Sequence, residues 1–259
     1  MSDIRKKLAE NFSLKGKTAL ITGSSQGIGK GIALAMAEYG ADIVLHYRQG
    51  HDEAKSVLKQ IKELGVQGSV IRADLSKTGS VAAMEKQLNG KPQPDILVIN
   101  ASLQIAKPWE QITQADFDAQ MHVNVKSTML LMQRFSPAMI QKGWGRIITI
   151  GSVQQVRPHP SMLVYAASKA AVLNMVQNVA MQLADKGVTV NNLAPGVIGT
   201  ARLKEHVPAV EERITKRQET PLGVVGEPQD CAAMAVLLAS DAGKFITGQN
   251  IFVDGGMSL

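Results

Sequence analysis

The sequence contains a single cysteine and no long run of apolar residues. Cys231 is the only cysteine among 259 residues, so no disulfide can form within the chain and the fold does not depend on oxidation. No apolar stretch is long enough to suggest a membrane-spanning helix. The charged first residues lack the apolar core of a secretory signal. We therefore expect a cytoplasmic protein in which Cys231 is a small buried residue.

Clusters of like charge are also missing. The net charge is +6, yet the basic residues are scattered, and the longest run of them is Arg5-Lys6-Lys7. Because nucleic-acid binding needs clustered lysine and arginine, we expect no nucleic-acid partner. We expect a solvated basic surface instead, and part of its charge can serve to bind an anionic cofactor or substrate. The five histidines, at positions 46, 51, 122, 159 and 206, show no metal-ligand spacing, and we expect no metal site.

The remaining composition is that of a globular α/β protein. Apolar residues make up 45% of the chain and charged residues 19%, which argues against disorder. The chain has 23 glycines but only 10 prolines, a mixture that suits tight turns between strands and helices better than proline-rich linkers. From residue 17 onward, short apolar segments alternate with segments of helical period.

This alternation predicts a parallel sheet covered by helices on both faces. We expect one doubly wound (Rossmann) domain over residues 1–259, with the irregular segment 201–226 forming a loop or small helices over the site. The predicted strands are 17–22, 42–47, 69–73, 95–100, 146–150, 188–193 and 250–253. The predicted helices are 28–39, 52–64, 77–89, 113–142, 161–186 and 227–240.

A glycine-rich turn joins the first strand to the first helix. It reads Thr22-Gly23-Ser24-Ser25-Gln26-Gly27-Ile28-Gly29. Glycines let the backbone turn sharply and approach a pyrophosphate, and the helix N-terminus adds unpaired N–H groups. The alternative is a mere glycine-rich turn, but its place at the start of the alternation favours nucleotide binding. The predicted cofactor contacts in this turn are Gly23, Ser25, Gln26, Gly27, Ile28 and Gly29.

A second motif, Tyr165-Ala166-Ala167-Ser168-Lys169, places a phenol and an ammonium on one face of a predicted helix. A free phenol has a pKa of about 10, and a nearby cation lowers it. Chance often produces such a Tyr–Lys pair on a protein surface. Here Ser152 precedes Tyr165 by thirteen residues and follows a predicted strand, where its hydroxyl can donate to a carbonyl oxygen.

The TGxxxGxG turn, Ser152 and the YxxxK motif, in this order, resemble the short-chain dehydrogenase/reductase family from about Leu14 to the C-terminus. The pattern is similar to the 3-oxoacyl carrier-protein reductase and glucose dehydrogenase branches. The resemblance implies an NAD(P)-dependent enzyme with Tyr165 as acid/base, Ser152 holding the substrate oxygen and Lys169 binding the nicotinamide ribose. It also implies that Asn124, inside a predicted helix, holds a water that links Lys169 to solvent.

The resemblance extends to further cofactor contacts. It implies that the nicotinamide contacts the segment after the sixth strand and that the adenine contacts Asp74. The alternative for Asp74 is to cap the next helix, a role that Ser76 can also fill. Ser102 stands where the family usually has glycine, and a side chain there would crowd the backbone near the cofactor ribose. The implied contacts are Asp74, Leu75, Asn100, Ala101, Tyr165, Lys169, Pro195, Gly196, Ile198 and Thr200.

The end of the second strand favours NADP over NAD. An acid at this place binds the ribose 2′-hydroxyl of NAD, whereas an arginine suits the 2′-phosphate of NADP. Here Tyr47 stands in the place of the acid and Arg48 follows it. The alternatives are that Arg48 is simply exposed and that NAD also serves. Many NADP-dependent relatives carry a basic residue at the position of Gln26, which this chain lacks.

Three segments are expected to face the substrate: Leu103–Lys107, Val153–Leu163 and Ala201–Gly226. The second of these contains Gln154, Gln155, Arg157 and His159, which favours a polar substrate such as a sugar, a sugar acid or a 3-oxoacyl group over a steroid. Ordinary loop polarity explains the same residues equally well. A nicotinamide-binding sensor or regulator without turnover is the alternative function. Loss of the tyrosine, lysine or serine would indicate it, and none is lost.

The last expectation concerns assembly. Between residues 170 and 183, apolar side chains cover more than one face of the predicted helix, so a second partner beyond the sheet is expected. A helix fully buried within a monomer is the alternative. A second copy of the chain would cover this face in a symmetric dimer. The resemblance extends this to a homotetramer, with the strand Asn250–Val253 near the other contact.

Overall fold

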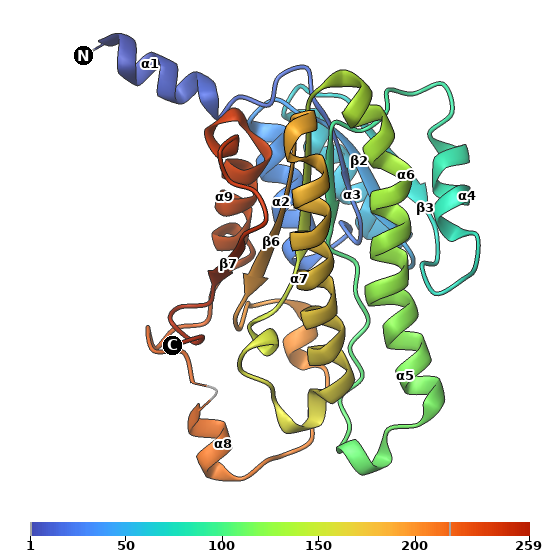
Figure 1. Cartoon of the computed structure of the whole chain (residues 1–259), viewed down its shortest axis with the longest axis vertical. Coiled ribbons are helices and arrows are strands. Elements are labelled where there is room, and N and C mark those ends of the chain that lie inside the picture. The colour runs from blue at the N-terminus through green and yellow to red at the C-terminus, as the bar shows by residue number, and fades with distance from the viewer. Residues whose placement is uncertain (1, 218) are drawn as a thin grey trace.

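The computed structural model describes residues 2–217 and 219–259, and its centre is a seven-stranded parallel sheet in the order β3-β2-β1-β4-β5-β6-β7 (Figure 1). The strand order reverses between β1 and β4, which is the place where ligands bind in such sheets. The predicted doubly wound, seven-stranded fold is therefore confirmed. The strands are β1 (Thr18–Ile21), β2 (Asp42–Tyr47), β3 (Gly68–Arg72), β4 (Ile96–Ile99), β5 (Gly145–Ile150), β6 (Val188–Pro195) and β7 (Asn250–Val253).

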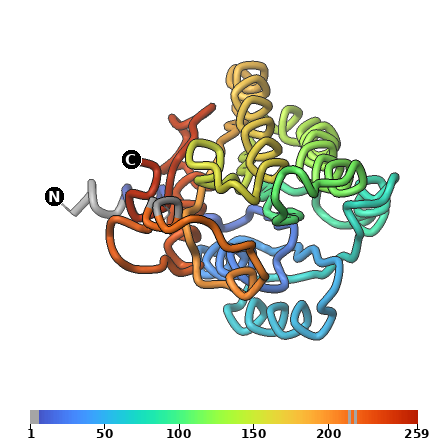
Figure 2. Tube along the Cα trace, turned by 90° about the horizontal axis from the view of Figure 1, so that it is seen from below, coloured from blue at the N-terminus to red at the C-terminus, as the bar shows by residue number. Residues whose placement is uncertain are grey.

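Helices cover both faces of the sheet (Figure 2). Neighbouring strand residues alternate between two buried clusters: Ala19 and Ile21 face one layer of helices, while Leu20 faces the other. Both strand faces are thus apolar, as expected of a parallel sheet covered on both sides. The first layer is α2 (Gly27–Glu38), α3 (His51–Glu63) and α9 (Pro228–Ala239), and the second is α4 (Ser80–Gln87), α6 (Ser127–Lys142) and α7 (Leu163–Leu183).

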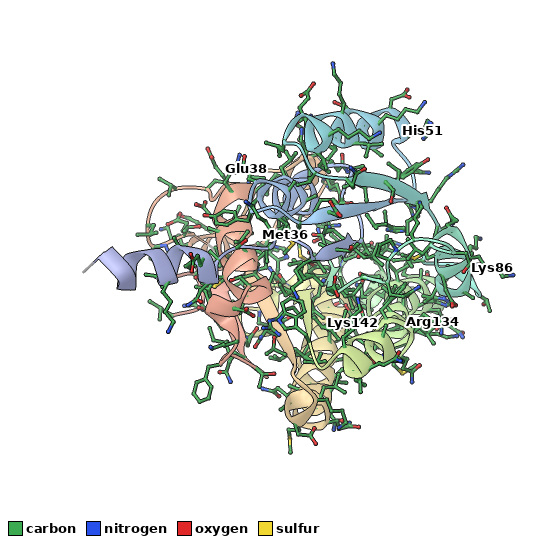
Figure 3. The ribbon with its side chains drawn as sticks, turned by 90° about the horizontal axis from the view of Figure 1, so that it is seen from above. Met36, Glu38, His51, Lys86, Arg134 and Lys142 are labelled. Carbon is green, nitrogen blue, oxygen red and sulfur yellow. The ribbon has the colours of Figure 1, made fainter. Side chains whose placement is uncertain are left out.

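Both layers pack on the sheet through buried apolar side chains, and further contacts join helices within each layer. In the first, Met36 is fully buried in the cluster that α2 shares with α9 (Figure 3), and a Cβ added at Gly31 would lie 3.0 Å from the Cβ of Pro228. In the second, an ion pair between Arg134 of α6 and Glu85 of α4 joins two helices on the surface. Close helix packing in the first layer leaves the phosphate turn, which opens α2, on a rigid support.

The long helices differ from their predicted extent. The predicted helix 113–142 is divided into α5 (Gln114–Met121), a π-helical turn η2 (His122–Lys126) and α6. The predicted helix 161–186 is α7, flanked by the 3₁₀ turns η4 (Pro160–Met162) and η5 (Ala184–Lys186). π-turns inside helices are rare and occur often at functional sites. The π-turn here contains Asn124.

The segments outside the sheet and its helices are short. Before β1 lies α1 (Ser2–Asn11), which periodicity did not predict. The irregular segment after β6 contains η6 (Ala201–Lys204) and α8 (Glu212–Arg217), as expected, and Figure 1 shows α8 beyond the carboxyl ends of the strands. The remaining 3₁₀ turns are η1 (Trp109–Gln111), η3 (Val153–Gln155) and η7 (Asp241–Gly243).

Two sequence expectations concern burial. Cys231 is fully buried in α9, as predicted, and burial together with the neighbouring Asp230 raises the pKa of its thiol to about 12. Across residues 2–217 and 219–259, no helix combines the length and the apolar character that crossing a membrane requires.

Candidate active site

A cleft of about 480 Å³ opens at the carboxyl ends of the strands. Its lining comes from the segments that follow β1, β2, β3, β4, β5 and β6, together with the start of α7. All predicted cofactor residues line this cleft except Gly29, which lies directly beneath the turn. Of the predicted catalytic residues, Ser152, Tyr165 and Lys169 line it, and Asn124 lies behind them. The topology thus brings both predicted groups together.

The phosphate turn needs its glycines for two different reasons. Gly23 and Gly27 have positive φ angles of 64° and 57°, where other residues are strained. A Cβ at Gly29 would lie 2.4 Å from the carbonyl oxygen of Gly23, so only hydrogen fits there. Gln26 is the N-cap of α2, and its side chain does not cap the helix. The first N–H groups of α2 therefore face the cleft, an arrangement that fits a pyrophosphate.

Asn100 and Thr22 lock this turn to the end of β4. The side-chain amide of Asn100 donates to the carbonyl oxygens of Thr22 and Gly23, both at 2.9 Å. The hydroxyl of Thr22 accepts from the backbone N–H groups of Asn100 and Ala101 at 2.9 and 3.0 Å. Asn100 thus positions the turn through its side chain. Sequence reasoning placed Asn100 at the cofactor but assigned no role to Thr22.

His46 is a third support of the turn, and sequence reasoning missed it. Its Nδ1 accepts from the N–H of Gly23 at 3.2 Å, so its Nε2 carries the proton and donates to the carbonyl oxygen of Ala73 at 3.2 Å. Burial lowers the pKa of His46 to about 4, against a smaller opposite effect of the bond to Ala73. The ring is therefore neutral at neutral pH, as its accepting role requires. The only sequence signal was a polar residue at a buried strand position.

Arg48 and Asp74 lie together at the ends of β2 and β3. Arg48 is exposed and lines the cleft, and its charge acts on Asp74. Burial raises the pKa of Asp74, but hydrogen bonds from Ser76 and the charges of Arg48 and Lys77 outweigh it and leave the pKa below its ordinary value. Gly79 is the N-cap of α4, so neither Asp74 nor Ser76 caps that helix. Asp74 instead accepts from Ser76 in a local turn.

Tyr165, Ser152 and Lys169 meet on the opposite side of the cleft. Against the larger effect of burial, Ser152 acts on Tyr165 to lower the pKa of its phenol, and the Nζ of Lys169 lies 5.5 Å from the centre of the Tyr165 ring. Lys169 also donates to the carbonyl oxygen of Ile150 at 2.6 Å. Ser152 is held as the N-cap of η3, where Gln155 completes a reciprocal capping pair. These contacts set a proton donor, a second hydroxyl and a cation around one point.

The titration of these groups is set first by burial. Burial raises the pKa of Tyr165 above its ordinary value, while the charge of Arg202 and hydrogen bonds with Ser152, Arg202 and Ser102 act in the opposite direction. Burial, followed by the charge of Arg202, lowers the pKa of Lys169 to about 7. The cation that favours the Tyr165 phenolate here is Arg202, a residue that sequence reasoning did not single out. The expected effect of Lys169 on that pKa stays a prediction.

Asn124 holds the catalytic helix and the loop after β4 in register. Its side-chain oxygen accepts from the N–H of Leu103, and its amide donates to the Leu103 carbonyl oxygen, both at 2.8 Å. The same amide donates to the hydroxyl of Ser168 at 2.9 Å. Both amide protons are therefore used within the protein. The expected water between Asn124 and Lys169 stays a prediction.

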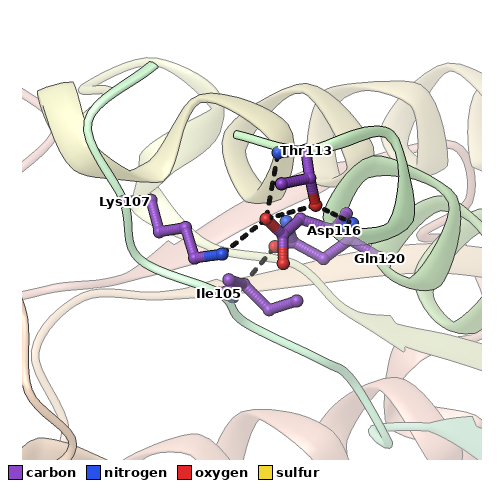
Figure 4. A network of polar contacts seen from close by, with 5 residues as sticks. All are labelled: Ile105, Lys107, Thr113, Asp116 and Gln120. Carbon is purple, nitrogen blue, oxygen red and sulfur yellow. Dashed lines mark hydrogen bonds and ion pairs between the residues drawn. The ribbon is translucent and has the colours of Figure 1, made fainter. Parts of the chain in front are cut away.

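The loop after β4 is fixed a second time by α5 (Figure 4). Lys107 donates to Asp116 at 2.6 Å, and the N–H of Ile105 donates to Gln120 at 3.0 Å. Asp116 also pairs with Thr113 in a capping box at the start of α5. The hydrogen bond from Lys107, followed by those from Thr113, lowers the pKa of Asp116 to about 2. This network holds the wall of the cleft on which Ser102 and Leu103 stand.

The segment after β6 closes the other wall. Ile198 is buried and pairs with Gly226, whose N–H donates to the carbonyl oxygen of Val197 at 3.0 Å. A Cβ added at Gly27 would lie 3.4 Å from the Thr200 methyl group, so Thr200 stands beside the phosphate turn. The segment from 195 to 200 therefore spans the cleft between Tyr165 and the turn, where the resemblance placed the nicotinamide.

The predicted substrate-facing polar residues divide into two groups. Gln154 lines the cleft and accepts from the N–H of His159 at 2.6 Å. Gln155 points inward and donates to the Lys169 carbonyl oxygen. Neither Arg157 nor His159 belongs to the cleft lining among the residues that the structure describes. Arg48 and Arg202 line the cleft, and Arg202 is the one whose charge acts on Tyr165.

Comparison with known proteins decides the family. A family model described as enoyl-(acyl carrier protein) reductase matches residues 23–258. The chain belongs to the short-chain dehydrogenase/reductase family. It is therefore an enzyme of the dehydrogenase/reductase class. A 7alpha-hydroxysteroid dehydrogenase of Escherichia coli K12 is 37% identical over 250 residues, which are 96% of each chain.

Solved structures of other family members also match this chain over nearly its whole length. A 3-oxoacyl (acyl-carrier-protein) reductase from Agrobacterium tumefaciens C58 with NADP bound has a TM-score of 0.88 and 36% identity, covering 96% of this chain and 97% of the other. A gluconate 5-dehydrogenase from Burkholderia cenocepacia J2315, in complex with NADP and tartrate, has a TM-score of 0.86 and 32% identity, covering 96% and 98%. Short-chain dehydrogenases with different substrates thus share this backbone.

Proposed function

We propose that the protein is an NADP(H)-preferring oxidoreductase that interconverts a carbonyl and a secondary alcohol on a polar small molecule. The observation that carries the proposal is the meeting of Tyr165, Ser152 and Lys169 in the cleft that the phosphate turn also lines. A sensor without turnover needs no proton donor there, and the relatives described above are named as enzymes.

Each catalytic side chain has one role in this proposal. The bound nicotinamide supplies or accepts the hydride. In the reducing direction Tyr165 gives its hydroxyl proton to the substrate oxygen, and Ser152 donates a hydrogen bond to the same oxygen. Lys169 binds the nicotinamide ribose, and Asn124 holds the water through which the proton is replaced. Oxidation of the alcohol reverses each step.

The preference for NADP rests on the end of β2. Arg48 offers a guanidinium in the cleft, and the preceding Tyr47 is occupied by a hydrogen bond of its hydroxyl to His51 at 2.6 Å. No carboxylate is supplied by either residue for a ribose 2′-hydroxyl. Two of the relatives described above were crystallised with NADP. NAD remains the second cofactor that the same cleft fits.

The substrate class is a sugar, a sugar acid or a 3-oxoacyl group. Relatives named as a gluconate 5-dehydrogenase and a 3-oxoacyl reductase support the last two. The test is NADPH oxidation against a panel of sugar, oxo-acid and 3-oxoacyl carbonyl compounds, repeated with NADH. We expect turnover of at least one class, with NADPH preferred. No turnover across the panel, or a preference for NADH, would contradict the proposal.

We further propose that the chain acts as a single cytoplasmic NAD(P)-binding domain, with 201–226 as its substrate loop, assembled as a homotetramer or at least a dimer. The outer face of α7 supports this, since Met181 is 84% exposed and Ala170 is exposed as well. Near β7, Phe245 is fully exposed, at 101%. Light scattering at micromolar concentration should give a multiple of 27.7 kDa. A mass near that of one chain would refute the assembly.

A further inference from the structure

Ser102 and Arg202 meet inside the cleft although 100 residues separate them. The Nη1 of Arg202 donates to the Ser102 hydroxyl at 3.0 Å, and its Nη2 donates to the Ser102 carbonyl oxygen at 3.1 Å. Two bonds to one residue fix the plane of the guanidinium as well as its position. The first of these bonds needs the side chain of Ser102. A glycine at this position would offer only the carbonyl.

This pair stands at the catalytic hydroxyl. The charge of Arg202 acts on the Tyr165 hydroxyl and favours its ionised form, and Ser102, Tyr165 and Arg202 all line the cleft. Arg202 is half-buried on the short turn η6, directly after the segment that crosses the cleft. The guanidinium therefore faces the place where the reacting oxygen of a substrate has to meet Tyr165.

Arg202 forms no ion pair with a carboxylate of the residues that the structure describes. In the described part of the chain, no carboxylate lies within the 4.0 Å of an ion pair with Arg202, although Glu205 also lines the cleft. The charge of Arg202 disfavours the charged form of Lys169, which lines the same cleft. A half-buried cation without a partner is costly, and at a catalytic centre it marks a place for an anion.

The guanidinium also has donors to spare. It has about five N–H donors, of which Ser102 takes two. The remaining donors can bind a carboxylate. A neutral carbonyl needs no such group, since Tyr165 and Ser152 already hold its oxygen.

We propose that Arg202, held by Ser102, binds a carboxylate of the substrate next to its reacting carbon. This deepens the proposed function and rests on it. Because the charge of Arg202 acts on the hydroxyl of Tyr165, which also has to meet the reacting oxygen, we place the carboxylate about one or two carbons from the reacting carbon, given hydrogen bonds of about 3 Å. The substrate class is thus 2- or 3-oxo acids and the corresponding hydroxy acids.

The reaction balances in this form. The hydride from NADPH forms the new C–H bond at the carbonyl carbon, the C=O π pair takes the proton of Tyr165, and the products are the hydroxy acid and NADP⁺. The carboxylate stays ionised on Arg202 and takes no part in bond making. Steroids and acyl thioesters have no free carboxylate at this distance, so the subsite separates this chain from relatives that act on them.

The first test compares an acid with its neutral ester. Acetoacetate and methyl acetoacetate, and likewise pyruvate and methyl pyruvate, are reduced with NADPH by the wild-type enzyme and by Arg202→Gln. A hydrogen-bonded charge pair is worth about 10- to 100-fold in affinity, so we expect kcat/KM for the acid to fall by about that factor, mainly through KM. The ester should lose only the smaller factor that comes from the charge of Arg202 on Tyr165, and that loss should appear in kcat rather than in KM.

Two further variants sharpen this test. Ser102→Gly keeps the Arg202 guanidinium but removes the hydroxyl that helps to fix its position. The value of kcat/KM for the acid should therefore fall, by a smaller factor than in Arg202→Gln. Lys204→Gln removes an exposed cation from the same turn without touching the cleft and should behave like the wild type. Equal losses on acid and ester in Arg202→Gln would overturn the proposal, because Arg202 would then act on Tyr165 alone.

A binding measurement tests the subsite without turnover. Malonate is titrated into the NADPH complex of each variant, with NADPH fluorescence as the signal. We expect saturable binding to the wild type and to Lys204→Gln, and at least about tenfold weaker binding to Arg202→Gln. Absence of malonate binding to the wild type, or equal affinity in Arg202→Gln, would overturn the proposal. Failure of the proposed function is distinct, since the neutral esters would then not be reduced either.

Discussion

We expect the burial of His46 to make the stability of the fold depend on pH. His46 accepts a hydrogen bond from Gly23 through Nδ1 and is buried, which lowers its pKa from 6.5 to about 4. A base with a depressed folded-state pKa stabilises the fold fully above its unfolded pKa. As pH falls below 6.5, His46 becomes protonated in the unfolded chain but not in the folded protein. The free energy of unfolding therefore declines until the pH is about 4.

The magnitude follows from this difference in pKa. A shift from 6.5 to about 4 corresponds to about 3 kcal/mol in total, of which about 2 kcal/mol is lost by about pH 5. We expect His46→Gln to remove this loss, because a glutamine amide can accept from Gly23 and donate to Ala73 without titrating. Every other group that titrates in this pH range is the same in both proteins, so the difference between wild type and His46→Gln reports on His46 alone.

The assay is urea denaturation of both proteins at about pH 7 and about pH 5, at one fixed protein concentration because subunit association also stabilises the fold. The free energy of unfolding of the wild type should fall by about 2 kcal/mol more than that of His46→Gln. Parallel losses in the two proteins would refute the reasoning, since His46 would then titrate alike in the folded and unfolded states.

Two further predictions concern the cofactor end of the cleft. Arg48→Ala should raise KM for NADPH and hardly change KM for NADH, which steady-state kinetics with both cofactors will check; a similar rise for both would contradict the 2′-phosphate assignment. Gly29→Ala places a methyl group 2.4 Å from the Gly23 carbonyl oxygen and should cost about 1–3 kcal/mol of stability in urea, together with weaker NADPH binding. An unchanged variant would show that the turn is looser than described.

The strands were predicted well because they are buried on both faces. The predicted bounds 42–47 and 250–253 agree with β2 and β7, and the other strands differ by one or two residues. The phosphate turn was predictable for a local reason, since its glycines all lie in the short segment from Gly23 to Gly29. By contrast, the π-turn at Asn124 was not predicted, because the apolar residues keep their helical spacing through it in the sequence.

The contacts that sequence reasoning missed are long-range. Arg202 reaches Ser102 across 100 residues, and its direction depends on how the segment after β6 crosses the cleft. Ser102 was noticed only as a departure from the family glycine, with crowding of the cofactor as the expected effect. In the sequence, His46 is a single polar residue within an apolar strand. Its role as acceptor for Gly23 depends on the phosphate turn that packs against it. Arg157 was expected to face the substrate, but it is not among the described residues that line the cleft.

The central claim is that Tyr165 is the proton donor of a reductase, and single-turnover reduction by Tyr165→Phe tests it most directly. NADPH binding, followed by fluorescence, should stay close to that of the wild type, because the phenyl ring keeps the packing of α7 and Lys169 is unchanged. The rate of NADPH oxidation on the best carbonyl of the panel should fall by about 10²–10⁴-fold, as expected when general acid catalysis is lost. A variant that binds NADPH and retains a near-wild-type rate would contradict the account.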